Sequence, residues 1–196
     1  MLKVVVLISG GGSNLKALLE AASASDYPVR IAAVGSDTDA PGLEHARRAG
    51  VPTFVVRPRE HEDRAAWGNA LAAAIREYEP GLVVSAGLMR VLPAGFVREF
   101  SPNLINTHPA LLPLHPGAHA VRDALAAGAT ETGVTVHIID EGVDTGPVLR
   151  QRSVQIRDGE TEDELHERIK QIERPLLVET VRDIANGALS LTRFAG

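Results

Sequence analysis

The chain has 196 residues, a net charge of −5 and no cysteine. This length suits one domain with its own core, and the lack of cysteine excludes disulfides, thiolate metal sites and cysteine nucleophiles. The acidic balance and the low aromatic content argue against a nucleic-acid partner, and no apolar run reaches the ~18 residues of a membrane span. We therefore expect a cytoplasmic protein that acts on small molecules, as a monomer or a homodimer.

The first part of the chain alternates between apolar runs and helical patterns. Strands are predicted at residues 3–10, 29–36, 52–56, 81–87 and 103–108. Helices are predicted between them at residues 15–24, 41–50, 62–79 and 93–100, and Ser13 or Asn14 is the expected N-cap of the first helix. This alternation is typical of βαβ units on a parallel sheet.

The pattern changes after residue 117. A helix is predicted at residues 119–128, and two strands follow at 133–140 and 147–156. No helix separates these strands, so we expect them to pair antiparallel.

The last predicted helix covers residues 161–187. Thr161 and Glu164 have the spacing of a capping box, and Pro175 is expected to kink the helix. The fold class is thus α/β: a mostly parallel, Rossmann-like sheet flanked by helices, with an antiparallel C-terminal strand pair and a long C-terminal helix.

Open parallel sheets bind ligands beyond the carboxyl ends of their strands. Four such ends carry polar or glycine-rich residues, at 9–14, 35–37, 87–90 and 106–109. We expect these four groups to gather at one edge of the sheet.

The segment SGGGSN, residues 9–14, joins the first strand to the first helix. Glycines allow a tight turn, and free N–H groups at a helix start suit a phosphate. The dinucleotide fingerprint would need glycine where Leu15 stands, although Asp37 lies about where a ribose-binding acid is expected. The pattern favours a monophosphate site, with a plain βα turn as the structural alternative.

Three polar side chains are candidates for catalysis. Asn106 and His108 are two residues apart on the fifth predicted strand, so they point to the same side, while Thr107 points to the other. Asp144 lies in the Gly-rich link 141–146. Amide and imidazolium N–H groups can stabilise an oxyanion, and a carboxylate can accept a proton or raise the pKa of a histidine. The trio fits acyl transfer, although each residue alone also fits a structural role.

Two other kinds of site fit the sequence poorly. The possible metal ligands His108, His115, His119, His137 and Asp144 match no recognised ligand spacing. A serine hydrolase would need a G-x-S-x-G elbow, which neither available serine of the glycine turn has.

Four segments occur in the order found in one enzyme family: ISGGGSNL, AGLMRVL, NTHPALLPLHPG and HIIDEGVDTGPV. Together they resemble the phosphoribosylglycinamide formyltransferases, also called GAR transformylases, over most of the chain. The resemblance implies transfer of a formyl group from 10-formyltetrahydrofolate to the amine of glycinamide ribonucleotide in de novo purine biosynthesis. It implies direct attack through a tetrahedral intermediate, with the folate as co-substrate and no metal.

The same resemblance implies roles for individual residues. His108, assisted by Asn106, would stabilise the oxyanion, and Asp144 would tune His108 and relay the amine proton through water. The ribonucleotide would be held by Gly11, Gly12, Ser13, Asn14, Lys170 and Glu173, and the folate by Met89, Arg90, Val91, Leu92, Ile139, Asp140 and Glu141. The resemblance further implies a single domain over residues 1–196, with a phosphate-binding half at 1–100 and a catalytic, folate-binding half at 101–196.

Ala110, Leu114 and His115 depart from the family pattern, in a loop that we expect to be mobile. Two alternative hypotheses remain. A formyltetrahydrofolate hydrolase would use water as acceptor. A non-catalytic nucleotide-binding module would use the glycine turn for phosphate, with His108 in a structural role.

Overall fold

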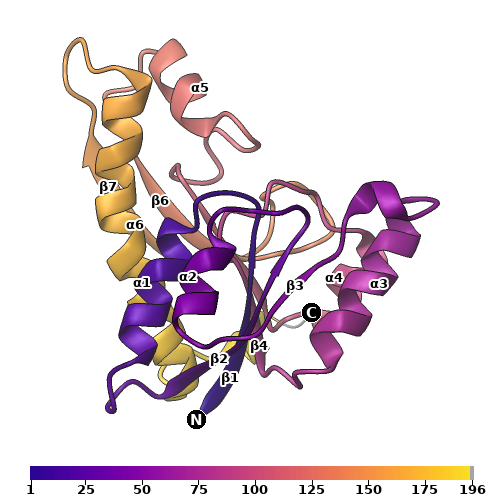
Figure 1. The fold of residues 1–196 in the computed structure, drawn as a ribbon. Helices are drawn as coiled ribbons and strands as arrows, with labels where there is room; N and C mark the ends of the chain where they lie inside the picture. Colours follow the sequence, from indigo (N-terminus) through magenta and orange to yellow (C-terminus); the bar gives the residue numbers. More distant parts are fainter. Residues whose placement is uncertain (195–196) are drawn as a thin grey trace.

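The computed structural model describes residues 1–194 (Figure 1). Its seven strands are β1 (Leu2–Ile8), β2 (Val29–Ser36), β3 (Thr53–Val55), β4 (Leu82–Ser85), β5 (Leu104–His108), β6 (Glu131–Ile138) and β7 (Val148–Gln155). The helices are α1 (Ser13–Ala22), α2 (Leu43–Arg48), α3 (Arg64–Arg76), α4 (Ala94–Phe100), α5 (Ala120–Ala126) and α6 (Glu162–Ala185), with short 3₁₀ helices at Pro58–Glu60 and Leu191–Phe194. Residues 195–196 of the predicted domain lie outside the described residues.

All seven strands form one sheet, in the order β3-β2-β1-β4-β5-β6-β7. The strands from β1 to β5 pair in parallel, and β6 pairs antiparallel with both β5 and β7. The predicted antiparallel pair is therefore confirmed, and the junction with β5 is antiparallel as well. The strand order reverses between β1 and β4, which places the usual ligand crevice of an open α/β sheet at their carboxyl ends.

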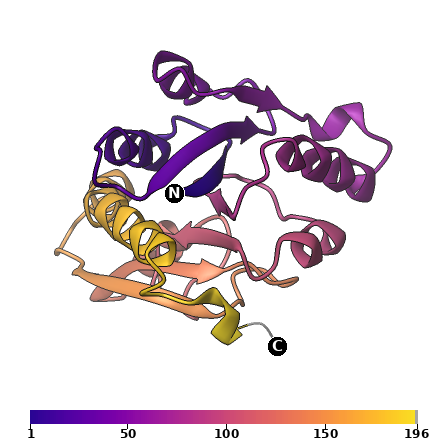
Figure 2. The ribbon, with the colours of Figure 1, turned by 90° about the horizontal axis from the view of Figure 1, so that it is seen from below.

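Helices cover both faces of the sheet (Figure 2). One core cluster joins the sheet to α1, α2, α5 and α6, and a second joins the opposite face to α3 and α4. The apolar run of β1 explains this arrangement, because its alternate residues pack into different clusters: Val4 and Val6 into the first, Val5 and Leu7 into the second. The sheet is thus a rigid platform whose edges and strand ends carry the polar groups.

The helix ends partly correct the sequence predictions. Neither Ser13 nor Asn14 caps α1; Gly12 occupies the N-cap with a left-handed φ of 71° and provides no side-chain cap. Helix α3 begins later than predicted, because the carboxylate of Asp63 caps it by accepting from the N–H of Ala66. The capping box of Thr161 and Glu164 is confirmed.

Helix α6 is assigned without a break through Pro175, which lies inside it. The predicted kink is not otherwise tested. Among residues 1–194, none of the helices has both the length and the apolar character needed to cross a membrane.

The predicted gathering of strand ends is confirmed at β1, β2 and β4. The Ser9 hydroxyl donates to the Asp37 carboxylate at 2.6 Å, and the N–H of Met89 donates to the same hydroxyl at 2.8 Å. The backbone of Ser9 also donates to the carbonyl of Gly87 at 3.0 Å. Three segments far apart in sequence therefore meet at the carboxyl edge of the sheet.

Candidate active site

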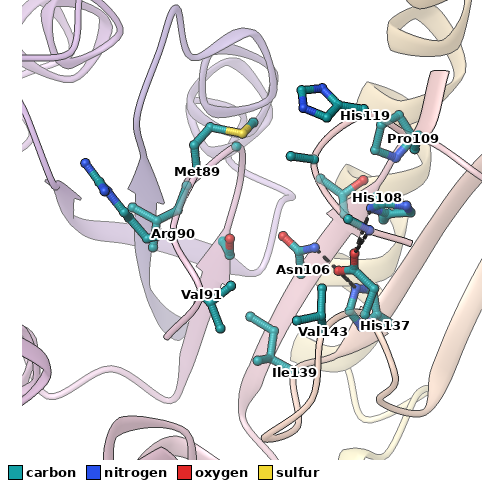
Figure 3. Close-up of a pocket in the computed structure, with 18 of the residues that line it drawn as sticks. Met89, Arg90, Val91, Asn106, His108, Pro109, His119, His137, Ile139 and Val143 are labelled. Atoms are coloured by element: carbon teal, nitrogen blue, oxygen red, sulfur yellow. Dashed lines mark hydrogen bonds and ion pairs between the residues drawn. The ribbon is translucent and has the colours of Figure 1, made fainter. Parts of the chain in front are cut away.

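A pocket of about 320 Å³ opens at this edge. One wall is the 87–92 loop that follows β4, and the other is formed by the ends of β5 and β6 with the 139–144 loop. Figure 3 shows Met89 and Val91 on one side of the pocket and Asn106, His108 and His137 on the other, while the Arg90 side chain extends away from them. The volume lies within the ~300–1,000 Å³ typical of small-molecule sites.

Strand β5 presents Asn106 and His108 to this pocket, as predicted from their spacing. Thr107 points to the opposite face, where its hydroxyl donates to Glu173 of α6 at 2.8 Å. The antiparallel register sets His137 of β6 opposite Asn106, and the Nδ2 of Asn106 lies 3.2 Å from the Nε2 of His137. The end of β5 thus presents polar side chains on both sides: Asn106 and His108 toward the pocket, and Thr107 toward α6.

Asp144 completes a cluster with both histidines. One carboxylate oxygen lies 3.4 Å from Nδ1 of His108, and the other lies 3.6 Å from Nε2 of His137. The N–H of Gly117 donates to the first oxygen at 2.7 Å. Asp144 has a positive φ of 54°, which is uncommon for a residue other than glycine. We relate this strained backbone conformation to the direction of the Asp144 carboxylate, which points toward the two histidines.

The hydrogen bonds indicate which ring nitrogen of each histidine carries a proton. Nδ1 of His137 lies 2.9 Å from the carbonyl of Ile138, which can only accept, so Nδ1 carries a proton. In the neutral ring Nε2 then accepts from Asn106, and only the doubly protonated ring can donate to Asp144. For His108, Nε2 donates to the carbonyl of His115 at 2.8 Å, so a second proton on Nδ1 would lie between the ring and Asp144.

The surroundings of Asp144 favour its ionised form. The interaction with His137 has the largest effect, and the Gly117 N–H and the charge of His108 add to it, so the pKa of Asp144 falls from 3.8 to about 2 despite partial burial. The Gly117 bond acts in every protonation state, whereas the His137 contribution requires the imidazolium form. Asp144 is therefore a negative charge that lies between two imidazole rings.

The glycine turn forms a second candidate site at the start of α1. Gly12 adopts the left-handed conformation, and an added Cβ would lie 3.1 Å from the Cα of Gly42. The turn is held by two bonds from the α2 segment: Gly42 N–H donates to the carbonyl of Gly10 at 3.0 Å, and His45 Nε2 donates to that of Gly11 at 3.1 Å. A tight, braced turn with free helix N–H groups suits an anion.

Asn14 adds a side-chain observation to this turn. It is 7% exposed, and within residues 1–194 its Oδ1 has no hydrogen-bond partner. This oxygen is therefore not used by the protein's own donors and can accept from a ligand hydroxyl.

The two predicted ribonucleotide residues of α6 lie in different environments. Glu173 is 6% exposed and accepts from Thr107 beneath the end of β5. Lys170 forms an ion pair with Glu167 at 2.7 Å rather than with Glu173. The structure therefore does not bring the two together as a pair.

The predicted folate residues mostly line the pocket. Met89, Arg90, Val91, Leu92, Ile139 and Asp140 do so. Glu141 is the exception: it is exposed, forms an ion pair with Arg98 at 2.9 Å, and is not among the lining residues. On the other wall, the guanidinium of Arg64 donates to the carbonyl of Val91 at 2.7 Å and so anchors the 87–92 loop from α3.

The structure also shows the surroundings of the three positions that depart from the family pattern. Ala110 is fully buried, and its carbonyl accepts from Thr135 at 2.7 Å. Leu114 is 58% exposed, while His115 adopts a positive φ of 51° and offers its carbonyl to His108. The 110–119 loop is therefore tied through its backbone to His108 and Asp144.

Sequence reasoning considered His137 only as a metal ligand and gave Gly117 no role. Both belong to the cluster around Asp144. A signal for His137 was present, because it lies on an alternating strand, but only the β5–β6 register identifies its partner. Within the described residues, no group of three or more His, Cys, Asp or Glu side chains is arranged to hold a metal ion.

Comparison with known proteins identifies the family of this chain. The formyl transferase family model matches residues 2–181. Phosphoribosylglycinamide formyltransferase of Mycobacterium tuberculosis (strain CDC 1551 / Oshkosh) is 50% identical over 189 residues, covering 96% of this chain and 87% of that protein. The Escherichia coli (strain K12) protein of the same name is 38% identical over 191 residues, covering 97% and 90%.

A solved structure supports the same relationship. The crystal structure of glycinamide ribonucleotide transformylase 1 from Symbiobacterium toebii matches with a TM-score of 0.93 and 40% identity, covering 95% of this chain and 89% of that one. Sequence, fold and pocket therefore agree, and the chain belongs to the formyl transferase family, among the phosphoribosylglycinamide formyltransferases.

Proposed function

We propose that this enzyme transfers a formyl group from 10-formyltetrahydrofolate to the amine of glycinamide ribonucleotide. The observation that carries the proposal is the cluster of Asn106, His108 and Asp144 at the end of the pocket. An amide, an imidazole and an ionised carboxylate converge there, which is the set of groups that acyl transfer to an amine needs.

The folate donor occupies the pocket between the two walls. Exposed apolar side chains at its mouth, Met89, Val91 and Val143, offer surface for an aromatic ring system. Within residues 1–194, no hydrogen bond uses the backbone N–H of Arg90, Val91 or Leu92. These groups are therefore available to a heterocycle with donors and acceptors on its edge.

The ribonucleotide phosphate binds the turn formed by Gly11, Gly12, Ser13 and Asn14, where free helix N–H groups favour an anion. The buried Glu173 contributes an acceptor for ribose hydroxyls, and Lys170 adds positive charge on the same helix. On this proposal, residues 1–100 supply the phosphate site, and residues 101–196 supply the catalytic groups and much of the folate site.

The chemistry follows from the positions of the three catalytic groups. The amine nitrogen bonds to the formyl carbon, and the bond from that carbon to the folate N10 then breaks. Nε2–H of His108 and the amide of Asn106 stabilise the developing oxyanion, for which the formyl oxygen replaces the carbonyl of His115 as the acceptor from His108. Asp144 holds the doubly protonated ring in place and passes the proton lost by the amine, through water, toward the departing nitrogen.

The two alternative functions differ from this proposal in what accepts the formyl group: water in one case, and nothing in the other. A formyltetrahydrofolate hydrolase would use the same cluster with water, but it would have no use for a braced anion turn. A non-catalytic nucleotide-binding module would not need an ionised Asp144 between two histidines. Both features favour the transferase.

The direct experiment mixes the protein with 10-formyltetrahydrofolate and glycinamide ribonucleotide and follows folate release by absorbance. We expect release that depends on both substrates, with formylated ribonucleotide as product. Release without ribonucleotide would favour the hydrolase, and no release under any condition would contradict both enzymes.

A further inference from the structure

Asp37 is a buried carboxylate that the chemistry above does not use. It follows β2, and its side chain is only 4% exposed. The sequence places it where a ribose-binding acid would stand, yet both oxygens already have partners inside the protein. One accepts from the Ser9 hydroxyl at 2.6 Å, and the other accepts from Nε of Arg90 at 2.7 Å. The carboxylate is therefore committed to the protein rather than open to a sugar.

Both partners lead to the same loop. Ser9 has one hydroxyl proton, which goes to Asp37, so its oxygen is free to accept the N–H of Met89 at 2.8 Å. Arg90, the next residue, contacts Asp37 directly. A single carboxylate thus fixes two consecutive residues of the 87–92 loop, one through a hydroxyl and one through a guanidinium.

The tip of the loop needs such an anchor because its other contacts are few: Leu88 and Leu92 are buried at its two ends, and the guanidinium of Arg64 donates to the carbonyl of Val91. Residues 88–93 have no helix or strand, and Met89 and Val91 are 69% and 50% exposed. Burial therefore contributes little at its tip, and a free loop would sample many backbone conformations. Its shape nevertheless forms one wall of the pocket.

The pairing with Arg90 joins a buried carboxylate to a planar guanidinium, a side chain suited to ion pairs with carboxylates. Burial on the Asp37 side limits screening by salt, although the Arg90 side chain is 52% exposed. The anchor is thus a direct contact between two charged side chains that are 53 residues apart in sequence.

We propose that Asp37 is a positioning residue for the folate donor: it holds the 87–92 loop, through Ser9 and Arg90, in the shape that receives the heterocycle. The inference rests on the proposed function and goes beyond it by assigning a role to a residue remote from the reacting atoms. Asp37 acts on the affinity for folate and leaves the chemical step and the phosphate site alone.

The test compares Asp37→Asn with the wild type and with a matched control. Asn keeps the size of the side chain but loses the charge that holds Arg90. The control, Asp39→Asn, removes a carboxylate two residues away that is 75% exposed and pairs with Arg57 outside the loop. We expect Asp37→Asn to raise both the KM for 10-formyltetrahydrofolate and the Kd for tetrahydrofolate about tenfold or more. The KM for ribonucleotide and kcat should stay within about twofold, and the control should match the wild type.

Two further measurements separate positioning from a general loss of structure. Amide hydrogen exchange should accelerate in residues 88–92 of Asp37→Asn and remain unchanged in α6. In an Arg90→Gln background, adding Asp37→Asn should raise the folate Kd much less than it does in the wild type, because the two residues act through one contact.

The outcomes are distinguishable. An Asp37→Asn variant with the wild-type Kd for tetrahydrofolate overturns the inference, as does an equal rise in both KM values with a lowered Tm. A wild-type protein that binds tetrahydrofolate but transfers no formyl group contradicts the proposed function and leaves the loop measurement valid. A wild-type protein that binds no tetrahydrofolate contradicts both.

Discussion

The glycine turn and the cluster around Asp144 lie at the same edge of the sheet but are built differently. The turn uses consecutive residues, 10–14, and offers backbone N–H groups with no titratable side chain. The cluster uses side chains from β5, β6 and the 139–144 loop, and all of its charges belong to Asp144 and two histidines. One site can hold a charge without changing, whereas the other can move a proton.

This difference predicts how variants should separate. Damage to the turn should weaken ribonucleotide binding and leave the chemical step intact. Damage to the cluster should slow the chemical step and leave binding measurable. A turn variant with a lowered kcat, or a cluster variant that loses ribonucleotide binding, would contradict this separation.

The largest effect is expected for Asp144→Asn. The amide keeps the shape but loses the fixed negative charge that faces both histidines and that handles the amine proton. We expect kcat to fall about 10²–10⁴-fold, the range of a lost acid–base group, while ribonucleotide binding measured by calorimetry stays near the wild-type value. Asp158→Asn, an exposed loop residue, is the control. A wild-type kcat in Asp144→Asn would show that the proton follows another route.

Asn106→Ala should have the next largest effect. It removes the amide that contacts His137 and that we propose as an oxyanion donor. Loss of one such donor typically lowers kcat about 10²–10³-fold. Asn103→Ala, just before the same strand, removes an exposed amide and should have the wild-type rate. If both variants retain full kcat, His108 stabilises the oxyanion alone.

The cluster should also make the free energy of unfolding depend on pH in the acid range. The folded-state pKa of Asp144, about 2, lies below its usual 3.8, so the ionised form stabilises the fold above pH ~4 and this contribution is lost between about pH 4 and 2. The lost part is at most about 2 kcal/mol. Urea unfolding at pH 6 and pH 2.5 should show a larger drop in the free energy of unfolding for the wild type than for Asp144→Asn. Equal drops would mean that the pKa of Asp144 is not lowered.

The two sites also differ in how far the sequence could predict them. The turn was predicted because its signal is local: glycines follow a buried strand and precede a helix. The cap was nevertheless wrong, because Gly12 takes the N-cap position in the left-handed conformation. Ser13 and Asn14 are then the first residues of α1, with their side chains released from capping. Residue preferences therefore predicted the turn and the helix but assigned the N-cap to the wrong residue.

The cluster required long-range information. The sequence indicated Asn106, His108 and Asp144, but His137 entered only when the register of β5 and β6 was known. Asp37 is a similar case: its spacing suggested a ribose ligand, and its contact with Arg90, 53 residues away, gives it another role. Glu141 was assigned to the folate site by resemblance, and its ion pair with Arg98, 43 residues away, is again a contact that the sequence does not indicate.

The smallest effect is expected at the turn itself. Ser13→Asp places a carboxylate in the first turn of α1, where an acid is well tolerated by the helix dipole, so the fold should remain stable. The same carboxylate would repel a bound phosphate, and we expect the KM for ribonucleotide to rise about tenfold with kcat and folate KM unchanged. Ser25→Asp, an exposed residue just beyond the other end of α1, controls for the added charge. A fall in kcat for Ser13→Asp at saturating ribonucleotide would mean that the turn also orients the amine, and the separation between a binding site and a chemical site would no longer hold.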